Sequence, residues 1–498
     1  MKQKILMLTI GLAIGPVFSA SPPMAPVVTP ELHLNTAEPA LPNNLREGKE
    51  WVPTTETVQT KIIEVDEEAL LANPELLERV MYSAIVGQNL AGIKASLPIY
   101  EKLPTQDPML LAYARAIVAR ADGRAADSVA YYRQVIAQQP DALAVRMQLA
   151  QALFENSENE AANDQFNKLQ AENLPDEVRE VVKGYQEALL KRDSWSFYAG
   201  VNILREKNIN QAPKERRLGG YLSEEECSQA QAANPNDDCY RGWTFNEPID
   251  ALGINYQFGS SKKWSWQRGY YGKLDVDGYG KYYPSETDYN DMTLRVAPAV
   301  GYADQRDEVG VSPFHERRLY GNKAYSYTNG ARVYWNRWWT PALQSLSAFE
   351  YGNVNNTQRS RSDNTNQLAS GSLLYYASAR QYWLAGVDLY RERNPDDDSD
   401  SFNRYNSRIA WGQEWPKGIS SRVQLNYARR YYRAPTMFSD GANRRDKEWG
   451  ARVSLWHRSV HFGGMTPRLT FSRNSIGSND EYYEHNKNRL YLELNKTF

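Results

Sequence analysis

From residue 194 to residue 498, hydrophobic and polar positions alternate along the chain. The last ten residues, RLYLELNKTF, place Leu490, Leu492, Leu494 and Phe498 on one side of an extended strand, because successive side chains point to opposite faces. The other side is mostly polar. A terminal strand with one apolar and one polar face, ending in an aromatic residue, is typical of the closing strand of a bacterial outer-membrane barrel.

The same alternation predicts fourteen strands. They span residues 194–204, 249–260, 263–277, 290–303, 310–319, 326–337, 342–352, 367–379, 382–393, 402–415, 419–432, 444–458, 464–475 and 485–498. Each is long enough for the ~9–11 residues that a tilted transmembrane strand needs. A transmembrane antiparallel β-barrel of about fourteen strands is therefore expected over residues 193–498, with the first and last strands paired.

The lengths of the connections support a barrel. Tight gaps follow the second, eighth and tenth strands, at Ser261 and Lys262, at Arg380 and Gln381, and at residues 416–418. Connections after the first, third, seventh, ninth and eleventh strands are long and polar. Outer-membrane barrels combine short periplasmic turns with long outer loops, so both ends of the barrel segment are expected on the periplasmic side. A soluble β-sandwich, the alternative, explains the alternation but not this parity.

Upstream of the strands, the spacing of the apolar residues changes to the period of helices. A shift of 34 residues aligns residues 109–139 with residues 143–173, placing Ala116 on Ala150 and Tyr132 on Phe166. Thirty-four residues is the tetratricopeptide (TPR) period. The pattern predicts helices at residues 109–121, 124–138, 142–154 and 158–170, with a final helix from Pro175. We expect a TPR-like domain over residues 65–192 with a concave surface for polypeptides; an ordinary helical bundle is the alternative.

The N-terminus indicates export. Lys2 and Lys4 precede an apolar run and then the small residues Ser19 and Ala20, the layout of a secretory signal peptide over residues 1–20. Residues 21–64 are rich in proline and predict an extended periplasmic tether. No later apolar run approaches the ~18 residues of a spanning helix, so membrane insertion of the mature chain would require a closed barrel.

The composition bears on the choice of fold class. The mean hydropathy is -0.67 although 12% of residues are aromatic. A barrel with a polar lumen and aromatic girdles has this balance, and so does a tyrosine-rich soluble β protein. The net charge of -2 gives no support for a nucleic-acid partner.

Few residues suggest site chemistry. Cys227 and Cys239 lie in the long first outer loop, where an oxidising compartment favours a disulfide; the loop could plug the barrel or reach outward. The acidic residues 396–400 could bind calcium, but a solvated loop is favoured. The histidines are scattered and form no metal or catalytic motif: His33, His315, His457, His461 and His485. We expect no enzyme activity, metal or cofactor.

The predicted inward positions of the strands carry more basic than acidic residues. The arginines are Arg295, Arg332, Arg404, Arg408, Arg422, Arg430, Arg452, Arg468 and Arg489, against the acids Asp388, Glu414 and Glu493. They either form networks that stiffen a narrow barrel or line a polar path for a substrate, and the sequence leaves both interpretations open.

The order of signal peptide, tether, TPR-like domain and barrel resembles the surface lipoprotein assembly modulator (Slam) family. Residues 312–339, SPFHERRLYGNKAYSYTNGARVYWNRWW, are similar to the family's most recognisable barrel segment. The resemblance covers nearly the whole mature chain. It implies an outer-membrane translocon that delivers a surface lipoprotein, or a secreted haem- or metal-acquisition protein, to the cell surface, and it carries no catalytic residues.

The resemblance also implies partners. The helical domain would engage cargo or periplasmic chaperones, and the barrel assembly machinery would insert the barrel into the lipid bilayer. From the position of the last strand beside the first, we hypothesise that Phe498 marks the chain for insertion and that its neighbourhood forms the seam that opens towards the helical domain. A polysaccharide exporter that joins helical repeats to a barrel is the alternative function, and a passive porin is the next.

Overall fold

The computed structural model describes residues 67–304, 306–340, 342–378, 380–457, 459–460 and 465–497. The predicted signal peptide and tether, His33, His461 and Phe498 lie outside these residues. No helix in the described ranges is both long and apolar enough to cross a membrane.

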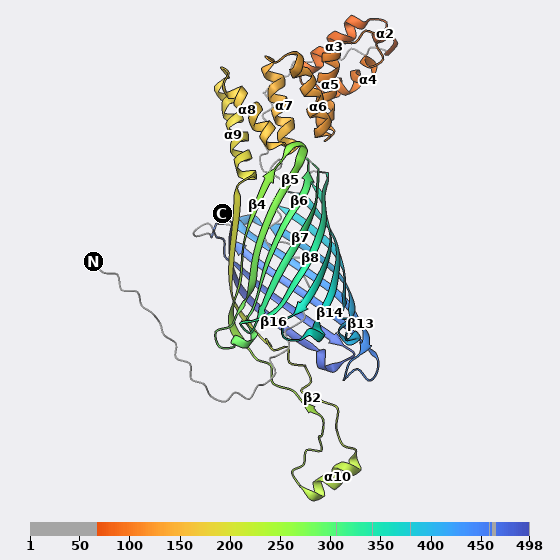
Figure 1. The fold of residues 1–498 in the computed structure, drawn as a ribbon, viewed down its shortest axis with the longest axis vertical. Helices are drawn as coiled ribbons and strands as arrows, with labels where there is room; N and C mark the ends of the chain where they lie inside the picture. The colour runs from red at the N-terminus through yellow and green to blue at the C-terminus, as the bar shows by residue number, and fades with distance from the viewer. Residues whose placement is uncertain are drawn as a thin grey trace, which may run out of the picture.

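The N-terminal part is a helical repeat domain. Its helices are α2 (Glu67–Leu71), α3 (Pro74–Val86), α4 (Leu90–Tyr100), α5 (Pro108–Ala121), α6 (Ala125–Gln138), α7 (Leu143–Glu155), α8 (Asn159–Gln170) and α9 (Asp176–Arg192). They form the pairs α3/α4, α5/α6 and α7/α8, followed by α9 (Figure 1). The first pair was not identified as a repeat from the sequence, although Pro74 and Pro108 begin α3 and α5 one TPR period apart.

Two features make the pairs equivalent. Each turn between paired helices holds one residue with positive φ: Gln88, Gly123 and Ser157, which recur at nearly the TPR period. Small buried residues then let the paired helices approach closely. Ser128 on α6, fully buried, donates a hydrogen bond of 2.9 Å from its Oγ to the carbonyl oxygen of Ala116 on α5.

The C-terminal part is a closed antiparallel barrel of fourteen strands. They are β1 (Trp195–Glu206), β4 (Ala251–Ser265), β5 (Tyr270–Tyr282), β6 (Asp291–Ala303), β7 (Asp307–Tyr320), β8 (Lys323–Thr340), β9 (Leu343–Asn356), β10 (Asn364–Ser378), β11 (Gln381–Arg393), β12 (Phe402–Glu414), β13 (Ile419–Pro435), β14 (Asn443–His457), β15 (Arg468–Ser478) and β16 (His485–Thr497). β1 pairs with β16, from Tyr198 opposite Thr497 to Glu206 opposite Arg489, so the predicted closure is confirmed.

One predicted turn was wrong. Ser261 and Lys262 lie within β4, and the chain turns at Trp266 and η1 (Gln267–Gly269). Ser261 faces the lumen and bonds Asp275, whereas Lys262 lies on the outward phase near the periplasmic end, where its amine reaches the carbonyl oxygen of Asp193. Two adjacent polar residues look like a turn in a sequence, which explains the error. The expectation of short periplasmic turns and long outer loops also has one exception at each end of the barrel. The outer turn at Gly321 and Asn322 is tight, and the periplasmic connection over residues 458–467 is long.

The outward strand positions form an apolar surface. Val300, Val387, Leu425, Leu469 and Leu490 each leave about half of their area uncovered by the protein. Apolar area on this scale is stabilised by contact with lipid and not by contact with water. The barrel is an outer-membrane barrel.

The two ends of the barrel carry different structures (Figure 1). The helical domain lies over one end, where α9 ends at Arg192 and β1 begins at Trp195. The opposite end carries the loop between β1 and β4, which contains β2 (Arg217–Leu218), α10 (Glu224–Ala233) and β3 (Trp243–Thr244). By the parity of the strands, the helical domain is on the periplasmic side.

Candidate functional site

Charged side chains cross-link the inward face of the barrel. Glu448 on β14 accepts a hydrogen bond of 2.8 Å from Arg404 on β12 and forms an ion pair of 2.8 Å with Arg430 on β13. Arg408 on β12 pairs with Asp388 on β11. The side chains of all three arginines are largely buried, so each carboxylate compensates a charge that is removed from water.

Some ion pairs bridge strands that are not neighbours. Arg295 on β6 reaches Glu350 on β9 at 2.8 Å, although β7 and β8 lie between those strands. Its guanidinium also lies 3.7 Å from the centre of the Phe314 ring. A side chain can span these strands only where the wall is strongly curved, so the lumen is narrow at this level.

The seam between β1 and β16 is held at its outer end by Glu206. This carboxylate is 0% exposed and contacts Lys281 at 3.3 Å, Arg489 at 3.1 Å and Lys487. Tyr283 donates a further hydrogen bond of 2.5 Å. Arg489 is predictable from the strand phase, but its acidic partner Glu206 is not. The only indication in the sequence is a single acidic residue at the end of a largely apolar strand.

The other predicted lumen arginines also lie on the inward strand phase. Arg468 lies with its guanidinium 4.5 Å from the centre of the Trp456 ring. For Arg332, Arg422 and Arg452, the described residues provide no carboxylate within ion-pair distance. The Nε of Arg422 is buried without a hydrogen-bond partner. Among the described residues, some inward arginines thus form ion pairs and others lie near no carboxylate, and the role of either set remains a prediction.

The closing strand has the orientation that its pattern predicts. Leu490 and Leu492 point outward, 51% and 42% exposed, while Tyr491 between them is buried inside. Leu494 is partly exposed. The role of this strand as an insertion signal stays a prediction.

The loop of residues 207–250 forms an arm outside the barrel (Figure 1). A disulfide joins Cys227 to Cys239, and Ser223 caps α10 by exchanging hydrogen bonds with Glu226. The hydrogen bond from the Ser223 side chain lowers the pKa of the Glu226 carboxyl. The tip of the arm is therefore a covalently closed helical turn.

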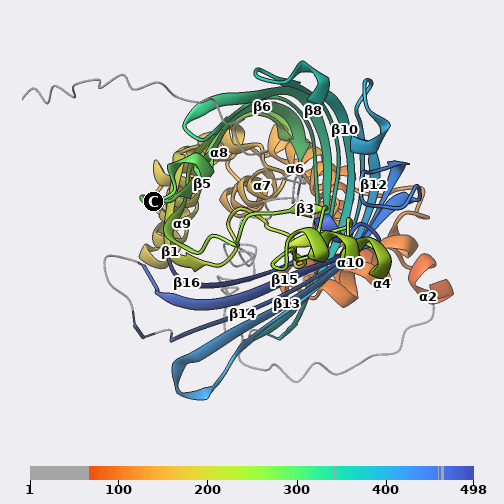
Figure 2. The same ribbon diagram turned by 90° about the horizontal axis from the view of Figure 1, so that it is seen from below.

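The stem of this arm is fastened to two other outer loops. Phe245 packs against Phe438, with ring centres 5.8 Å apart, and against Tyr482 at 4.9 Å. Trp243 also contacts Phe438, at 6.4 Å. We call Trp243, Phe245, Phe438 and Tyr482 the outer clasp. The stem crosses part of the barrel opening (Figure 2), while the tip of the arm reaches outward (Figure 1).

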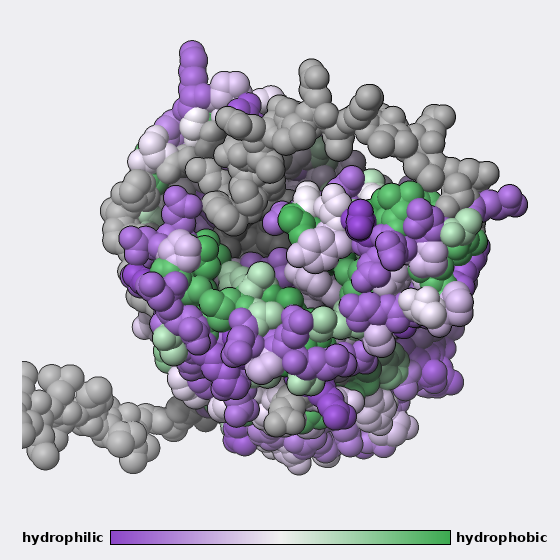
Figure 3. Space-filling model, turned by 90° about the horizontal axis from the view of Figure 1, so that it is seen from above, coloured by the Kyte–Doolittle hydropathy of each residue, from purple (hydrophilic) through white to green (hydrophobic). Residues whose placement is uncertain are grey.

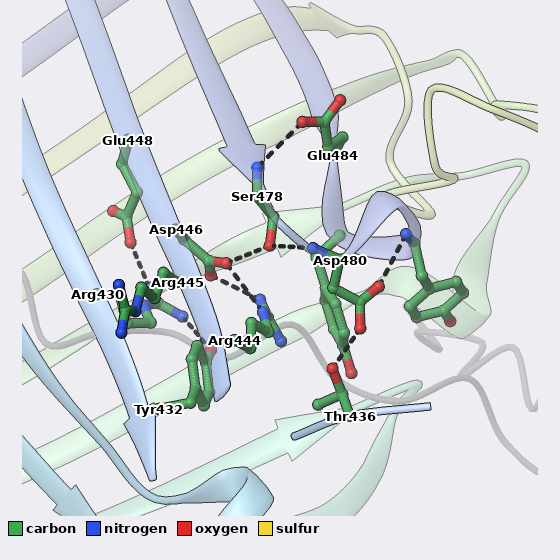
Figure 4. A network of polar contacts seen from close by, with 12 residues as sticks. Arg430, Tyr432, Thr436, Arg444, Arg445, Asp446, Glu448, Ser478, Asp480 and Glu484 are labelled. Atoms are coloured by element: carbon green, nitrogen blue, oxygen red, sulfur yellow. Dashed lines mark hydrogen bonds and ion pairs between the residues drawn. The ribbon is translucent and has the colours of Figure 1, made fainter. Parts of the chain in front are cut away.

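A polar network supports the outer clasp on the side of the barrel strands (Figure 4). Asp446 on β14 accepts hydrogen bonds from Arg444 at 2.7 Å and from Ser478 on β15 at 2.7 Å. Asp480 accepts a hydrogen bond from Thr436 and so connects the loop after β15 to the loop after β13. These contacts hold the two loops that receive Phe245.

At the periplasmic end, the helical domain is seated on the barrel by polar contacts. Asn159 on α8 donates a hydrogen bond of 2.8 Å to Ser265 on β4, which also bonds Asp193 at 2.8 Å. Arg306, in the turn between β6 and β7, donates a 2.7 Å hydrogen bond to the carbonyl oxygen of Asp122 at the end of α5. A cation at a helix C-terminus is favourable, and Gly123 has no side chain to obstruct the guanidinium.

The face of the helical domain away from the barrel carries both hydrophobic and hydrophilic side chains. Figure 3 shows hydrophobic patches in green among hydrophilic side chains on this side of the molecule. α3 alone exposes Leu76, Val80, Tyr82 and Val86. Exposed apolar residues at helical spacing are typical of surfaces that bind other polypeptides.

The acidic residues 396–400 and the histidines provide no metal centre among the residues that the structure describes, where no group of three His, Cys, Asp or Glu side chains could hold an ion. Asp397 instead accepts hydrogen bonds from Ser399, which closes a short turn.

Comparisons with known proteins agree with this architecture. A family model described as surface lipoprotein assembly modifier matches residues 195–498, and one described as the N-terminal TPR repeats of the same family matches residues 63–166. Surface lipoprotein assembly modifier 1 of Neisseria meningitidis serogroup B is 50% identical over 453 residues, which cover 90% of this chain and 88% of the relative.

Two more distant relatives have similar coverage. Surface lipoprotein assembly modifier of Moraxella catarrhalis is 41% identical over 87% of this chain and 82% of its own length. A protein of Acinetobacter baumannii named hemophilin secretion modulator is 23% identical and covers 90% of both chains. The matches extend over both the helical domain and the barrel.

Proposed function

The chain belongs to the surface lipoprotein assembly modifier family, and on that premise we propose that it is an outer-membrane translocon. In this proposal it delivers a partner protein from the periplasm to the cell surface. The observation that carries the proposal is the position of a polypeptide-binding type of repeat domain directly over the mouth of a membrane barrel. A barrel that only admits small solutes has no need of such a domain.

The names of the relatives suggest the class of partner. Most are named for surface lipoproteins, and one is named for hemophilin secretion. We therefore propose a surface lipoprotein, or a soluble haem-acquisition protein, as cargo. The exposed apolar residues of α3, Leu76, Val80 and Val86, are the first candidates to hold it in the periplasm, directly or together with chaperones.

The geometry favours cargo that crosses unfolded or partly folded. Barrels with open aqueous channels have about 16–18 strands, whereas this one has fourteen and is bridged inside by Arg295 and Glu350. The lumen offers one route, lined by Arg332, Arg422 and Arg452, which have no carboxylate within ion-pair distance among the described residues. The seam between β1 and β16 offers a second, lateral route.

A deletion experiment tests the proposal. We expect that deleting the gene removes at least one lipoprotein or haem-binding protein from the surface of intact cells while its total amount persists. Unchanged display of every such protein, with loss of a surface polymer, would instead support a polysaccharide exporter. Cargo stalled during export should cross-link to Arg430 or Arg452, and its failure to do so would exclude the lumen route.

A further inference from the structure

A cleft lies between the helical domain and the rim of the barrel. Its volume is about 280 Å³, and one wall comes from the helical domain, with Ser157, Asn159 and Arg192. The opposite wall comes from the periplasmic ends of β4, β6, β7, β8 and β9 and from the turn that carries Arg306. The cleft is thus formed by both parts of the chain.

The cleft opens towards the lumen. Lys263, Glu308, Asn336 and Gln344 line it, and all four lie on the inward phase of their strands. Lys263 lies 3.7 Å from Glu308, and its amine is 4.0 Å from the centre of the inward-facing Tyr271 ring. The floor of the cleft therefore continues into the inner wall of the barrel.

The two walls of the cleft are joined by polar contacts that an entering chain can replace. Asn159 to Ser265 and Arg306 to Asp122 are polar hydrogen bonds. Among the described residues, each buried apolar cluster lies either within the helical domain or within the barrel, and none joins the two. A polar chain that enters the cleft can take over these hydrogen bonds without exposing a hydrophobic core.

The lining suits an extended polypeptide. It combines the cations Arg192, Lys263 and Arg306 with acids at Asp307 and Glu308 and with the amides of Asn336 and Gln344, together with the ring of Trp338. Donors and acceptors of both charges recognise a peptide backbone with mixed side chains, whereas a site for one small anion or cation would carry one sign of charge.

We propose that this cleft is the site where an extended segment of the partner protein passes from the helical domain into the barrel. The inference rests on the proposed function, because it presumes a polypeptide cargo. It adds to that function a defined entrance on the β4–β9 side, beneath the α7–α8 turn.

Site-specific photo-cross-linking tests the entrance in the full chain, in cells. The probe is the surface lipoprotein whose display is lost on deletion of the gene, stalled during export by fusion to a stably folded domain. A photoreactive residue at Gln344 should form an adduct with it. The same residue at Ser345 is the matched control, because Ser345 is next in β9 but faces the opposite side of the strand.

The outcomes separate the two proposals. Adducts at Gln344 and not at Ser345 support the entrance. If display depends on the gene but no adduct forms at Gln344, the entrance is wrong and the translocon function stands. If no lipoprotein depends on the gene for display, both proposals fail.

A disulfide staple provides a second measurement. The variant with Asn159→Cys and Ser265→Cys joins the two walls where their side chains already touch. Oxidation should abolish display, and a reductant should restore it. The native chain treated with the same reductant controls for opening of the Cys227–Cys239 disulfide. Full display by the oxidised, stapled protein would overturn the entrance.

Discussion

Glu206 offers the sharpest test of how the barrel is closed. The variant Glu206→Gln keeps the shape of the side chain and removes its charge. Lys281, Lys487 and Arg489 would then face one another without the carboxylate that now lies among them. Breaking a buried ion pair by removing one partner costs about 3–5 kcal/mol, because the remaining charge stays buried and uncompensated. Glu206 is fully buried, so solvent screening reduces this estimate little.

The assay is urea unfolding of the barrel in lipid vesicles, followed by tryptophan fluorescence. With an m-value of about 3 kcal/mol/M, the loss corresponds to a downward shift of the midpoint by about 1 M or more. Tyr283→Phe removes one hydrogen bond to the same carboxylate and should cost about 1–2 kcal/mol. Glu247→Gln is the control, since Glu247 forms an exposed pair with Arg216 and should shift stability by less than about 1 kcal/mol.

A double variant checks the mechanism. Adding Lys487→Met to Glu206→Gln removes one of the three cations, so it should recover part of the lost stability. If Glu206→Gln behaved like Glu247→Gln, the carboxylate would not be what holds the outer end of the seam, and this reasoning would be refuted.

Three further predictions concern the ends of the barrel. Phe438→Ala removes the ring that both Trp243 and Phe245 contact, so the ion conductance of the protein in planar bilayers should rise, whereas Phe349→Ala on the lipid face should not change it. Arg306→Ala should free the α5–α6 turn from the rim and speed proteolysis near Asp193; an unchanged rate would show that Arg306 does not seat the domain. Cys227→Ser with Cys239→Ser should make the arm sensitive to protease on intact cells while the urea midpoint of the barrel stays unchanged; a shifted midpoint would contradict the separation of arm and barrel.

Periodicity along the chain predicted most of the architecture. Alternation located all fourteen barrel strands, because a wall between lipid and a wet lumen imposes it on nearly every strand. The 34-residue shift located two of the three helix pairs. The first pair escaped because α4 is short and contains Pro98, which lacks the backbone N–H that continues a helix and so looks like a boundary.

Less of the candidate site than of the fold could be predicted from the sequence. Strand phase assigned the inward arginines and Asp388, which pairs with Arg408, but not Glu448 or Glu350, since Glu350 meets Arg295 from three strands away. The outer clasp could not be predicted at all. Phe245, Phe438 and Tyr482 are far apart in sequence and meet only because the barrel closes and brings their loops to the same rim.

Transport in a purified system tests the central claim most directly. The protein is reconstituted into vesicles with the helical domain inside, together with an unfolded surface lipoprotein, and protease is added outside. The account predicts that the lipoprotein becomes sensitive to protease with time, and only in vesicles that contain the translocon. If the lipoprotein stayed protected in intact vesicles that hold correctly folded protein, the chain would not be a translocon for it.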